Sequence, residues 1–334
     1  MGKKTKEIIL GQKTNQREAY WSRVRELMKE DEDIVLVVAD QGAPAFDLIR
    51  KEFPARFIYT GIAEQNAILI ASGLAMEGKK VMVHAIASFL IMRSYEQIRI
   101  SNSVMGIPLT IVGIGAGFSY DDSGPTHHLL EDIALMRVLP GMTINSVTDN
   151  QMARQVADVS VNMTTPNYVR LDRHNDPNIY TKDIDFSKGF EVLRDGQDGY
   201  IISTGVMVRQ SLNVAERLNK KSISLGVIDI HTIPCKEDLF INAIKNSPRL
   251  ITLEEHFLPG GLGSYVVEML ADNKLNMEVK RLGLSNGYCY RYGGREDNWA
   301  YHGVDEKTVL NKVEDFVKMS GSVEALKKGA IIIG

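Results

Sequence analysis

The stretch RFIYTGIAEQNAILIASGLAM, residues 56–76, carries the pattern that decides the fold. Arg56–Tyr59 is an apolar run of strand length, and Glu64–Met76 has the length of a helix. The helix is apolar or small almost all the way round, which indicates burial. Strand, turn and buried helix together predict one βα unit of an α/β sheet.

The same alternation extends along the first half of the chain. Further strand-length apolar runs lie at Ile34–Ala39, Val81–Ile86, Leu109–Gly115, Met142–Val147 and Tyr168–Leu171. The other helix-length segments are Asn15–Glu30, Phe89–Asn102, Leu129–Val138 and Asp149–Met163. This order predicts a parallel sheet with helices on both faces, in a first domain of residues 1–171.

Residues 172–199 are polar, with Pro177 and several Asp and Gly residues, and are predicted to connect two domains through one short hairpin. The alternation then resumes. Strands are predicted at Tyr200–Ser203, Ser224–Ile230, Leu250–Leu253 and Val279–Leu284, and helices at Val208–Asn219, Lys236–Lys245, Gly263–Asp272 and Asp305–Met319. The fold class is therefore α/β, with a second, smaller parallel-sheet domain over residues 200–325.

Composition narrows the class of protein. The 334 residues, 44% hydrophobic and 24% charged, suit two globular domains. A net charge of −3 without a basic stripe does not indicate nucleic-acid binding. No apolar stretch has the length of a membrane span, and no signal peptide is visible. Cys235 and Cys289 lack metal-type spacing and are expected to be reduced core thiols of a cytoplasmic protein.

Three unusual loops follow predicted strands: Thr60–Asn66, Ala87–Tyr95 and Gly115–His128. Because ligands bind beyond the carboxyl ends of parallel strands, these loops are expected to meet at one site. Glu64 has two interpretations on physical grounds. It either caps the start of its helix, where the dipole favours a carboxylate, or it is a semi-buried acid whose pKa the surroundings tune.

GIAEQN (residues 61–66) and the small-residue helix after it resemble the thiamine-diphosphate signature of transketolases and deoxyxylulose-phosphate synthase. In that family the matching glutamate hydrogen-bonds the cofactor's aminopyrimidine ring and favours its imino tautomer. The resemblance therefore implies that Glu64 is catalytic. It extends from about Gln16 to Lys318, and it implies a pyrimidine-binding domain followed by a transketolase C-terminal-type domain.

The second loop, ASFLIMRSYEQIR (residues 87–99), reads by itself as the start of an amphipathic helix with core aromatics. It also resembles the family segment that holds the aminopyrimidine. The resemblance implies that Phe89 stacks on the cofactor ring and that Ile62, Met92, Arg93 and Tyr95 complete the pocket. Some family members place the aromatic three residues further on, where this chain has Met92.

The third loop, GAGFSYDDSGPTHH (residues 115–128), could by composition be a surface turn or a metal site. It resembles the family motif Asp-Gly-Pro-Thr-His, which implies that His127 is catalytic and lies near the reacting carbon and the hydroxyls of the donor sugar. Ser123 occupies the position where the family usually has Asp. The resemblance therefore implies the reaction class more firmly than the substrate.

An arginine that holds the substrate phosphate follows the next strand in the family. In YVRLDRH (residues 168–174), Arg173 matches best and Arg170 is the alternative. A guanidinium binds a phosphate or another oxyanion in a bidentate manner. The other interpretation is an arginine that ties down the interdomain connection.

The family anchors the cofactor's diphosphate through a divalent metal held by a Gly-Asp-Gly stretch and a later Asn. The only similar run here, Asp195–Gly199, has neither a strand before it nor the Asn after it. The resemblance therefore implies thiamine diphosphate as cofactor. It implies Mg²⁺ as well, with its ligands on a partner subunit and no metal ligand in this chain. The partner would carry the N-terminal-type, diphosphate-binding domain, in an α2β2 assembly.

The leading hypothesis is a subunit of a transketolase-like transferase, which moves a two-carbon ketol unit between phosphorylated or otherwise anionic sugars. One alternative is a decarboxylating enzyme that condenses a 2-oxoacid with an aldose, like deoxyxylulose-phosphate synthase. Another is a catalytically silent scaffold subunit, against which the presence of Glu64 and His127 argues.

Overall fold

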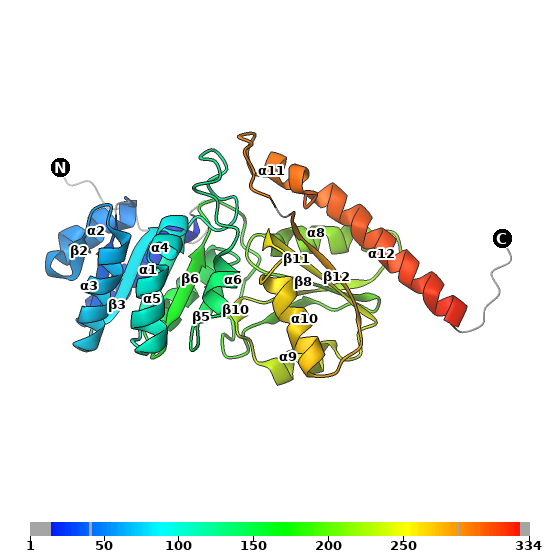
Figure 1. Ribbon diagram of the computed structural model, residues 1–334, viewed down its shortest axis with the longest axis horizontal. Helices are drawn as coiled ribbons and strands as arrows, with labels where there is room; N and C mark the ends of the chain where they lie inside the picture. The colour runs from blue at the N-terminus through cyan, green and yellow to red at the C-terminus, as the bar shows by residue number, and fades with distance from the viewer. Residues whose placement is uncertain (1–14, 40–41, 286, 328–334) are drawn as a thin grey trace.

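The structure is a computed structural model, which describes residues 15–39, 42–285 and 287–327. Figure 1 shows two α/β domains side by side, the first in blue to green and the second in green to orange. The long helix α12 (Glu306–Lys327) runs along the outer side of the second domain. The α/β architecture predicted from the alternation of apolar segments is confirmed.

The first sheet has a buried parallel centre. Its strands, in spatial order, are β10 (Thr232–Ile233), β5 (Thr143–Ser146), β6 (Asn167–Leu171), β4 (Thr110–Ile114), β3 (Lys80–Ile86), β1 (Ile34–Val38) and β2 (Phe57–Tyr59). All residues of β1 are buried, with Leu36 facing one core cluster and Val37 the other. Successive side chains of a strand point to opposite faces, so both faces need a cover.

Helices supply this cover. α1 (Gln16–Glu30), α2 (Pro44–Glu52) and α7 (Asn150–Ser160) pack on one face, and α3 (Glu64–Met76), α4 (Ala87–Arg93) and α6 (Asp132–Arg137) on the other. The single helix predicted over residues 89–102 is instead three pieces: α4, then α5 (Tyr95–Ile98) and a π-helical turn, η2 (Arg99–Val104). A short 3-10 helix, η1 (Pro54–Arg56), precedes β2.

The second sheet has the strand order β12 (Glu278–Leu284), β11 (Arg249–Phe257), β8 (Gly199–Ser203), β9 (Leu225–Asp229) and β7 (Glu191–Arg194). α9 (Glu237–Ile244) and α10 (Leu262–Asp272) pack on one face, and α8 (Met207–Asn219) and α12 on the other. α11 (Arg295–His302), which the sequence does not predict, reaches the first domain.

Two edge strands differ from the predicted parallel sheets. β7 pairs antiparallel with β9, and β10 pairs antiparallel with β5. β7 lies within residues 172–199, the predicted connection, and none of its side chains is buried. β10 has two residues. Short or half-exposed edge strands show no run of apolar residues, which is why the sequence does not reveal them.

β10 comes from the second half of the chain but extends the first sheet, so it joins the two domains. Next to this joint, Thr148 and Tyr180 donate hydrogen bonds of 2.6 and 2.9 Å to the carboxyl group of Asp229. Burial raises the pKa of Asp229 to about 7. Both hydroxyls donate to the same carboxyl oxygen, and these bonds offset part of the cost of burying the group.

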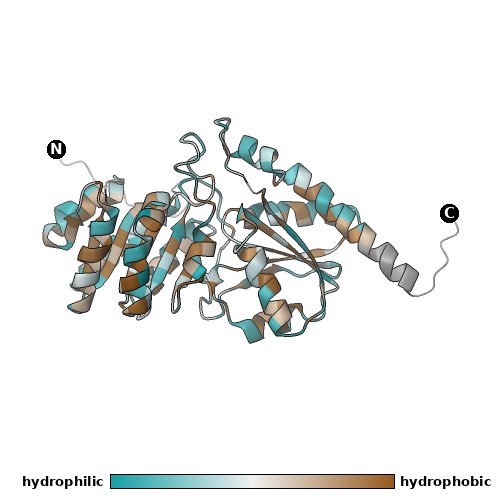
Figure 2. Cartoon of the chain, in the orientation of Figure 1, coloured by the Kyte–Doolittle hydropathy of each residue, from teal (hydrophilic) through white to brown (hydrophobic). Residues whose placement is uncertain are grey.

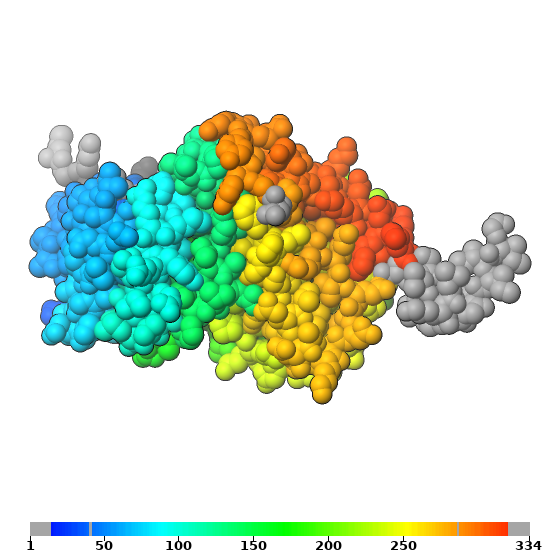
Figure 3. All heavy atoms as spheres, in the orientation of Figure 1, coloured from blue at the N-terminus to red at the C-terminus, as the bar shows by residue number. Residues whose placement is uncertain are grey.

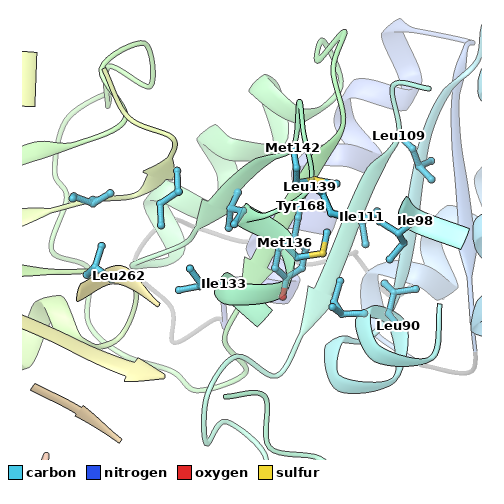
Figure 4. Packing of buried hydrophobic residues seen from close by; sticks show 14 of the residues in the cluster. Leu90, Ile98, Leu109, Ile111, Ile133, Met136, Leu139, Met142, Tyr168 and Leu262 are labelled. Carbon is cyan, nitrogen blue, oxygen red and sulfur yellow. The ribbon is translucent and has the colours of Figure 1, made fainter. Parts of the chain in front are cut away.

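The hydrophobic cores also run across the joint. One cluster of buried side chains includes Ile133 and Met136 of α6 together with Leu262 of α10. Figure 4 shows Ile133 between Leu262 and the side chains of Met136 and Tyr168. Because packed cores resist deformation, this contact fixes the second domain relative to the loops at the end of the first sheet.

Candidate functional site

The predicted site residues lie at the carboxyl ends of neighbouring strands. Glu64 follows β2, Phe89 and Arg93 belong to α4 after β3, the loop 115–131 follows β4, and Arg173 follows β6. In the sheet, β6, β4 and β3 are direct neighbours. This is the edge at which open parallel sheets bind ligands.

Glu64 is the first residue of α3, and 7% of its side chain is exposed. The Nη1 atom of Arg93 donates to both carboxylate oxygens, at 3.1 Å each. The structure thus holds the carboxylate by a charged hydrogen bond from across the site. In the described part of the chain, no side chain caps the start of α3.

Phe89 and Arg93 form a stacked pair on α4. The Cζ atom of Arg93 lies 4.3 Å from the centroid of the Phe89 ring. The His127 ring meets the Phe89 ring edge to face, with centroids 5.0 Å apart and planes at 73°. Three loops that are separate in sequence therefore form one cluster of Glu64, Arg93, Phe89 and His127.

The position of Arg93 shows what kind of ligand this cluster fits. Its guanidinium is planar, donates N–H groups to Glu64 and stacks on Phe89. The aminopyrimidine of thiamine diphosphate is also planar and would stack on Phe89, while its ring nitrogen would accept a hydrogen bond from the protonated carboxyl group of Glu64. The residues therefore fit the pyrimidine end of this cofactor, provided that Arg93, 49% exposed, turns outward.

The loop with His127 also approaches Arg173. The Arg173 Cζ atom lies 4.5 Å from the centroid of Tyr120, and its Nη2 donates to Asp122 at 3.2 Å. The rings of Tyr120 and His127 are 5.8 Å apart. The Arg173 side chain is 32% exposed, so its guanidinium is accessible to an oxyanion.

Ser123 has no charge where the family usually has Asp, but it lies beside the carboxylate of Asp122. Its hydroxyl donates a 3.0 Å hydrogen bond to Asp122. That bond and the nearby charge of Arg173 hold the pKa of Asp122 below its usual range. An ionised carboxylate is therefore present next to the position where the family usually has Asp.

Arg170, the alternative phosphate ligand, is a core residue. Its Nε donates to Asp132 at 2.7 Å, and Tyr168 donates to the same carboxylate oxygen at 2.8 Å. Because 5% of its side chain is exposed, Arg170 is not accessible to a substrate. Of the two arginines, only Arg173 contacts the loop that carries His127.

The other predicted pocket residues lie around the cluster. Ile62 and Met92 are 72% and 42% exposed, on its open side. The hydroxyl of Tyr95 donates to the carbonyl of Leu135 at 2.8 Å, so Tyr95 ties α5 to α6.

The sequence analysis assigned no role to Tyr120 of the loop 115–128 or to Arg295, which the structure places against this loop. The backbone N–H of Arg295 donates to Asp121 at 2.9 Å, although 174 positions separate them. No local pattern predicts such a contact.

The neighbouring His127 and His128 do not form a metal site. His128 is buried, and burial lowers its pKa to about 4. Among the described residues, no group of three or more His, Cys, Asp or Glu is placed to hold a metal ion.

In the part of the chain that the structure describes, no helix is both long and apolar enough to cross a bilayer. Cys235 and Cys289 are free and buried, as predicted.

Fold and site together define a two-domain α/β protein in which a buried glutamate, a phenylalanine and a histidine lie beyond the carboxyl ends of parallel strands. Residues 12–177 match the family described as transketolase, pyrimidine binding domain. Residues 189–309 match the transketolase, C-terminal domain. The chain belongs to the transketolase family and is a subunit of a transferase of that type.

Known relatives agree with this assignment. The chain is 34% identical over 306 residues to an apulose-4-phosphate transketolase subunit of Phocaeicola vulgatus, covering 90% of this chain and 97% of the relative. It is 33% identical over 307 residues to 1-deoxy-D-xylulose-5-phosphate synthase 1 of Geobacter sulfurreducens, covering 89% of this chain and 47% of the relative. Among solved structures, a split gene transketolase described as an inactive beta4 tetramer matches with a TM-score of 0.82 and 29% identity, covering 92% and 100%.

Proposed function

We propose that this chain is the pyrimidine-binding subunit of a two-chain, thiamine-diphosphate-dependent transketolase. It would move a two-carbon ketol unit between phosphorylated or otherwise anionic sugars. The observation that carries the proposal is the planar Arg93 cation, which lies between Glu64 and Phe89 where a planar ring would stack and hydrogen-bond. A relative 34% identical to this chain is named as one subunit of a transketolase.

Each residue of the cluster has a role in this proposal. Thiamine diphosphate, when bound, supplies the nucleophilic carbon of the reaction. Glu64 exchanges a proton at a carboxyl oxygen with the ring that Phe89 stacks on. His127 binds the donor sugar and moves protons near neutral pH. Ser123 contacts sugar hydroxyls beside Asp122, and Arg173 holds the phosphate.

We assign the diphosphate and Mg²⁺ to a partner subunit. The run Asp195–Gly199, the nearest match to the family's metal-binding stretch, does follow a strand, β7, contrary to the prediction, but it lies against the backbone of β9. A Cβ on Gly196 would lie 1.9 Å from the Gly226 nitrogen, so the close approach of two backbones requires this glycine. The proposal therefore includes a partner with the diphosphate-binding domain, in an α2β2 complex. A cytoplasmic location is part of it, since both cysteines are free.

The outer face of α3 is the surface proposed for this partner. Ile62, Leu69 and Met76, spaced by seven residues, are 72%, 53% and 64% exposed. Figure 2 shows hydrophobic residues along α3 and the helix beside it. Exposed apolar patches on proteins mark interaction surfaces. This patch starts two residues before Glu64, so a protein that covers it also borders the cofactor cluster.

Gly73 provides a test of this surface. It lies in the middle of α3, and a Cβ there would meet nothing within 4 Å. Glycine inside a helix costs about 1 kcal/mol relative to alanine, so nothing within this chain favours it. Gly73→Leu should leave the isolated chain at least as stable. It should weaken association by about 1–3 kcal/mol, the usual effect of overpacking, or roughly five- to 150-fold.

Thermal unfolding of the isolated chain and sedimentation of the mixed subunits measure the two effects. Leu239 on α9, 43% exposed in the other domain, is the matched control, and Leu239→Trp should associate normally. Wild-type association of a folded Gly73→Leu chain would show that the partner does not cover α3.

Reconstitution tests the proposed function itself. The isolated chain should bind thiamine diphosphate weakly, with or without Mg²⁺, because the pyrimidine contacts supply only part of the binding energy. Addition of the partner should tighten binding at least about tenfold and give ketol transfer from a phosphorylated ketose. Isothermal titration calorimetry measures the affinities. A tight, magnesium-dependent site on the isolated chain would contradict the division of the cofactor site between two subunits.

A decarboxylating condensation of a 2-oxoacid with an aldose is the second candidate, favoured by the similarity to 1-deoxy-D-xylulose-5-phosphate synthase 1. A panel of ketose and 2-oxoacid donors separates the two reactions, since only the second releases carbon dioxide. Release of carbon dioxide at the rate of product formation would assign the condensation.

A further inference from the structure

Arg295, the first residue of α11, is buried between the two domains. Its Nη2 atom lies 2.6 Å from Asp172 and 2.6 Å from Glu255, and its Nε lies 2.9 Å from the other Glu255 oxygen. Asp172 follows β6 of the first domain, and Glu255 belongs to β11 of the second. One guanidinium therefore pairs with a buried carboxylate from each domain.

The charge of Arg295 favours the ionised form of Asp172. Burial acts to raise the pKa of Asp172, but attraction to Arg295 and hydrogen bonds from His174 and Arg295 together outweigh it and hold the pKa well below the usual range. The Nη1 of Arg295 also lies 3.1 Å from Nδ1 of His174. Without the guanidinium, two buried carboxylates would have lost their common cation.

Glu255 supports the start of the loop 115–128. Gly117 has a φ of +59°, and a Cβ on it would lie 1.8 Å from a Glu255 oxygen. The backbone of the loop at Gly117 therefore packs directly against the Glu255 carboxylate. Trp299 of α11 donates its indole N–H to Glu255 as well. Arg295 and Trp299 thus hold Glu255 in the position on which the loop is built.

A second branch of contacts leads to Arg173. The backbone N–H of Arg295 donates to Asp121 at 2.9 Å, and the other Asp121 oxygen lies 3.7 Å from Nη2 of Arg173. Ser119 donates to Asp172 at 3.1 Å and accepts from the Arg173 backbone at 3.0 Å. Figure 3 shows the orange surface of the second domain against the green surface of the first at this place.

We propose that Arg295 is a positioning residue for substrate binding: from the second domain, it fixes the loop that carries Ser123 and His127 together with the Arg173 guanidinium. The inference rests on the proposed function, which gives these three residues their contact with substrate. Arg295 acts through Asp172, Glu255 and Asp121 and is 8% exposed, so it binds no substrate itself.

The experiment compares Arg295→Gln and Arg295→Lys in the complex reconstituted with the partner subunit. Arg295→Gln should lower kcat/KM for a phosphorylated ketose about tenfold, mainly through KM, because small displacements of positioning groups are costly. Arg295→Lys, which keeps the charge, should recover part of the loss. Hydrogen–deuterium exchange of residues 115–128 should increase in Arg295→Gln. Exchange of the thiazolium proton, which depends on Glu64, should be unchanged.

Two further variants keep the test decisive. Arg281, whose guanidinium donates to Leu258 and Ser264 inside the second domain, is the matched control, and Arg281→Gln should keep the wild-type KM. If Arg295→Gln does not fold, Asp121→Asn removes the charge that faces Arg173 and His174 but keeps the ion pairs of the Arg295 side chain, and it should raise KM without lowering the unfolding temperature. A wild-type KM in folded Arg295→Gln, or in Asp121→Asn, would overturn the proposal. Absence of thiazolium exchange in the wild-type complex would instead contradict the proposed function.

Discussion

Glu64→Gln should lower the turnover of the reconstituted complex on the order of 10²- to 10⁴-fold, the usual loss for a positioned acid–base group. Glutamine keeps the size of the side chain and can hydrogen-bond, but it cannot supply an acidic proton. The fold should tolerate the change. Although 7% of the Glu64 side chain is exposed, glutamine keeps an oxygen that can accept from Arg93, so the change should cost on the order of 1 kcal/mol.

Quenched-flow NMR of thiazolium proton exchange, together with thermal unfolding, measures both effects. Glu77→Gln, at the exposed end of the same helix, is the matched control and should exchange at the wild-type rate. If a well-folded Glu64→Gln complex also exchanged at the wild-type rate, Glu64 would not be the activating acid. The thiamine mechanism would then have to be abandoned.

Arg173→Ala should raise the KM of a phosphorylated substrate far more than that of its unphosphorylated counterpart. A charged hydrogen bond contributes roughly 1.5–3 kcal/mol, so the ratio of the two KM values should change by about one to two decades. In the free site Arg173 pairs with Asp122 and stacks on Tyr120. A substrate phosphate competes with Asp122 for Arg173, so we expect the change in the KM ratio to be nearer one decade than two.

The comparison of two substrates is the internal control for Arg173, because a general distortion of the loop would affect both equally. Equal losses would assign Arg173 to the structural role of tying down the connection after β6. Steady-state kinetics of the reconstituted complex with each substrate provides the measurement.

The parts of the fold that the sequence predicts are those with a local cause. Strands such as β1, buried on both faces, leave a continuous apolar run, and Glu64–Met76 has the same bounds in the structure as in the sequence analysis. Glu64, Phe89 and His127 also come together as expected, because each follows a strand of one parallel sheet.

The remaining features depend on contacts that are distant in sequence. Whether Arg170 or Arg173 faces the site is decided by Asp132, which pairs with Arg170 in the core. The contact between Tyr95 and α6 depends on the position of Leu135. The contribution of Arg295 requires two domains to pack together. Such choices are made by tertiary packing, and neither periodicity nor residue type records them.

Arg93 donates to Glu64 and stacks on Phe89, so under the proposed function the cofactor ring would have to displace its guanidinium. Glu64 would then exchange a donor for a ring nitrogen that accepts from its protonated carboxyl group. The binding free energy of any ligand at this place would then be its own contacts minus the contacts that Arg93 loses. A ring without a nitrogen atom that reaches Glu64 would gain less from displacing the guanidinium. Under the proposed function, the Arg93 side chain would therefore favour the pyrimidine over rings of other composition.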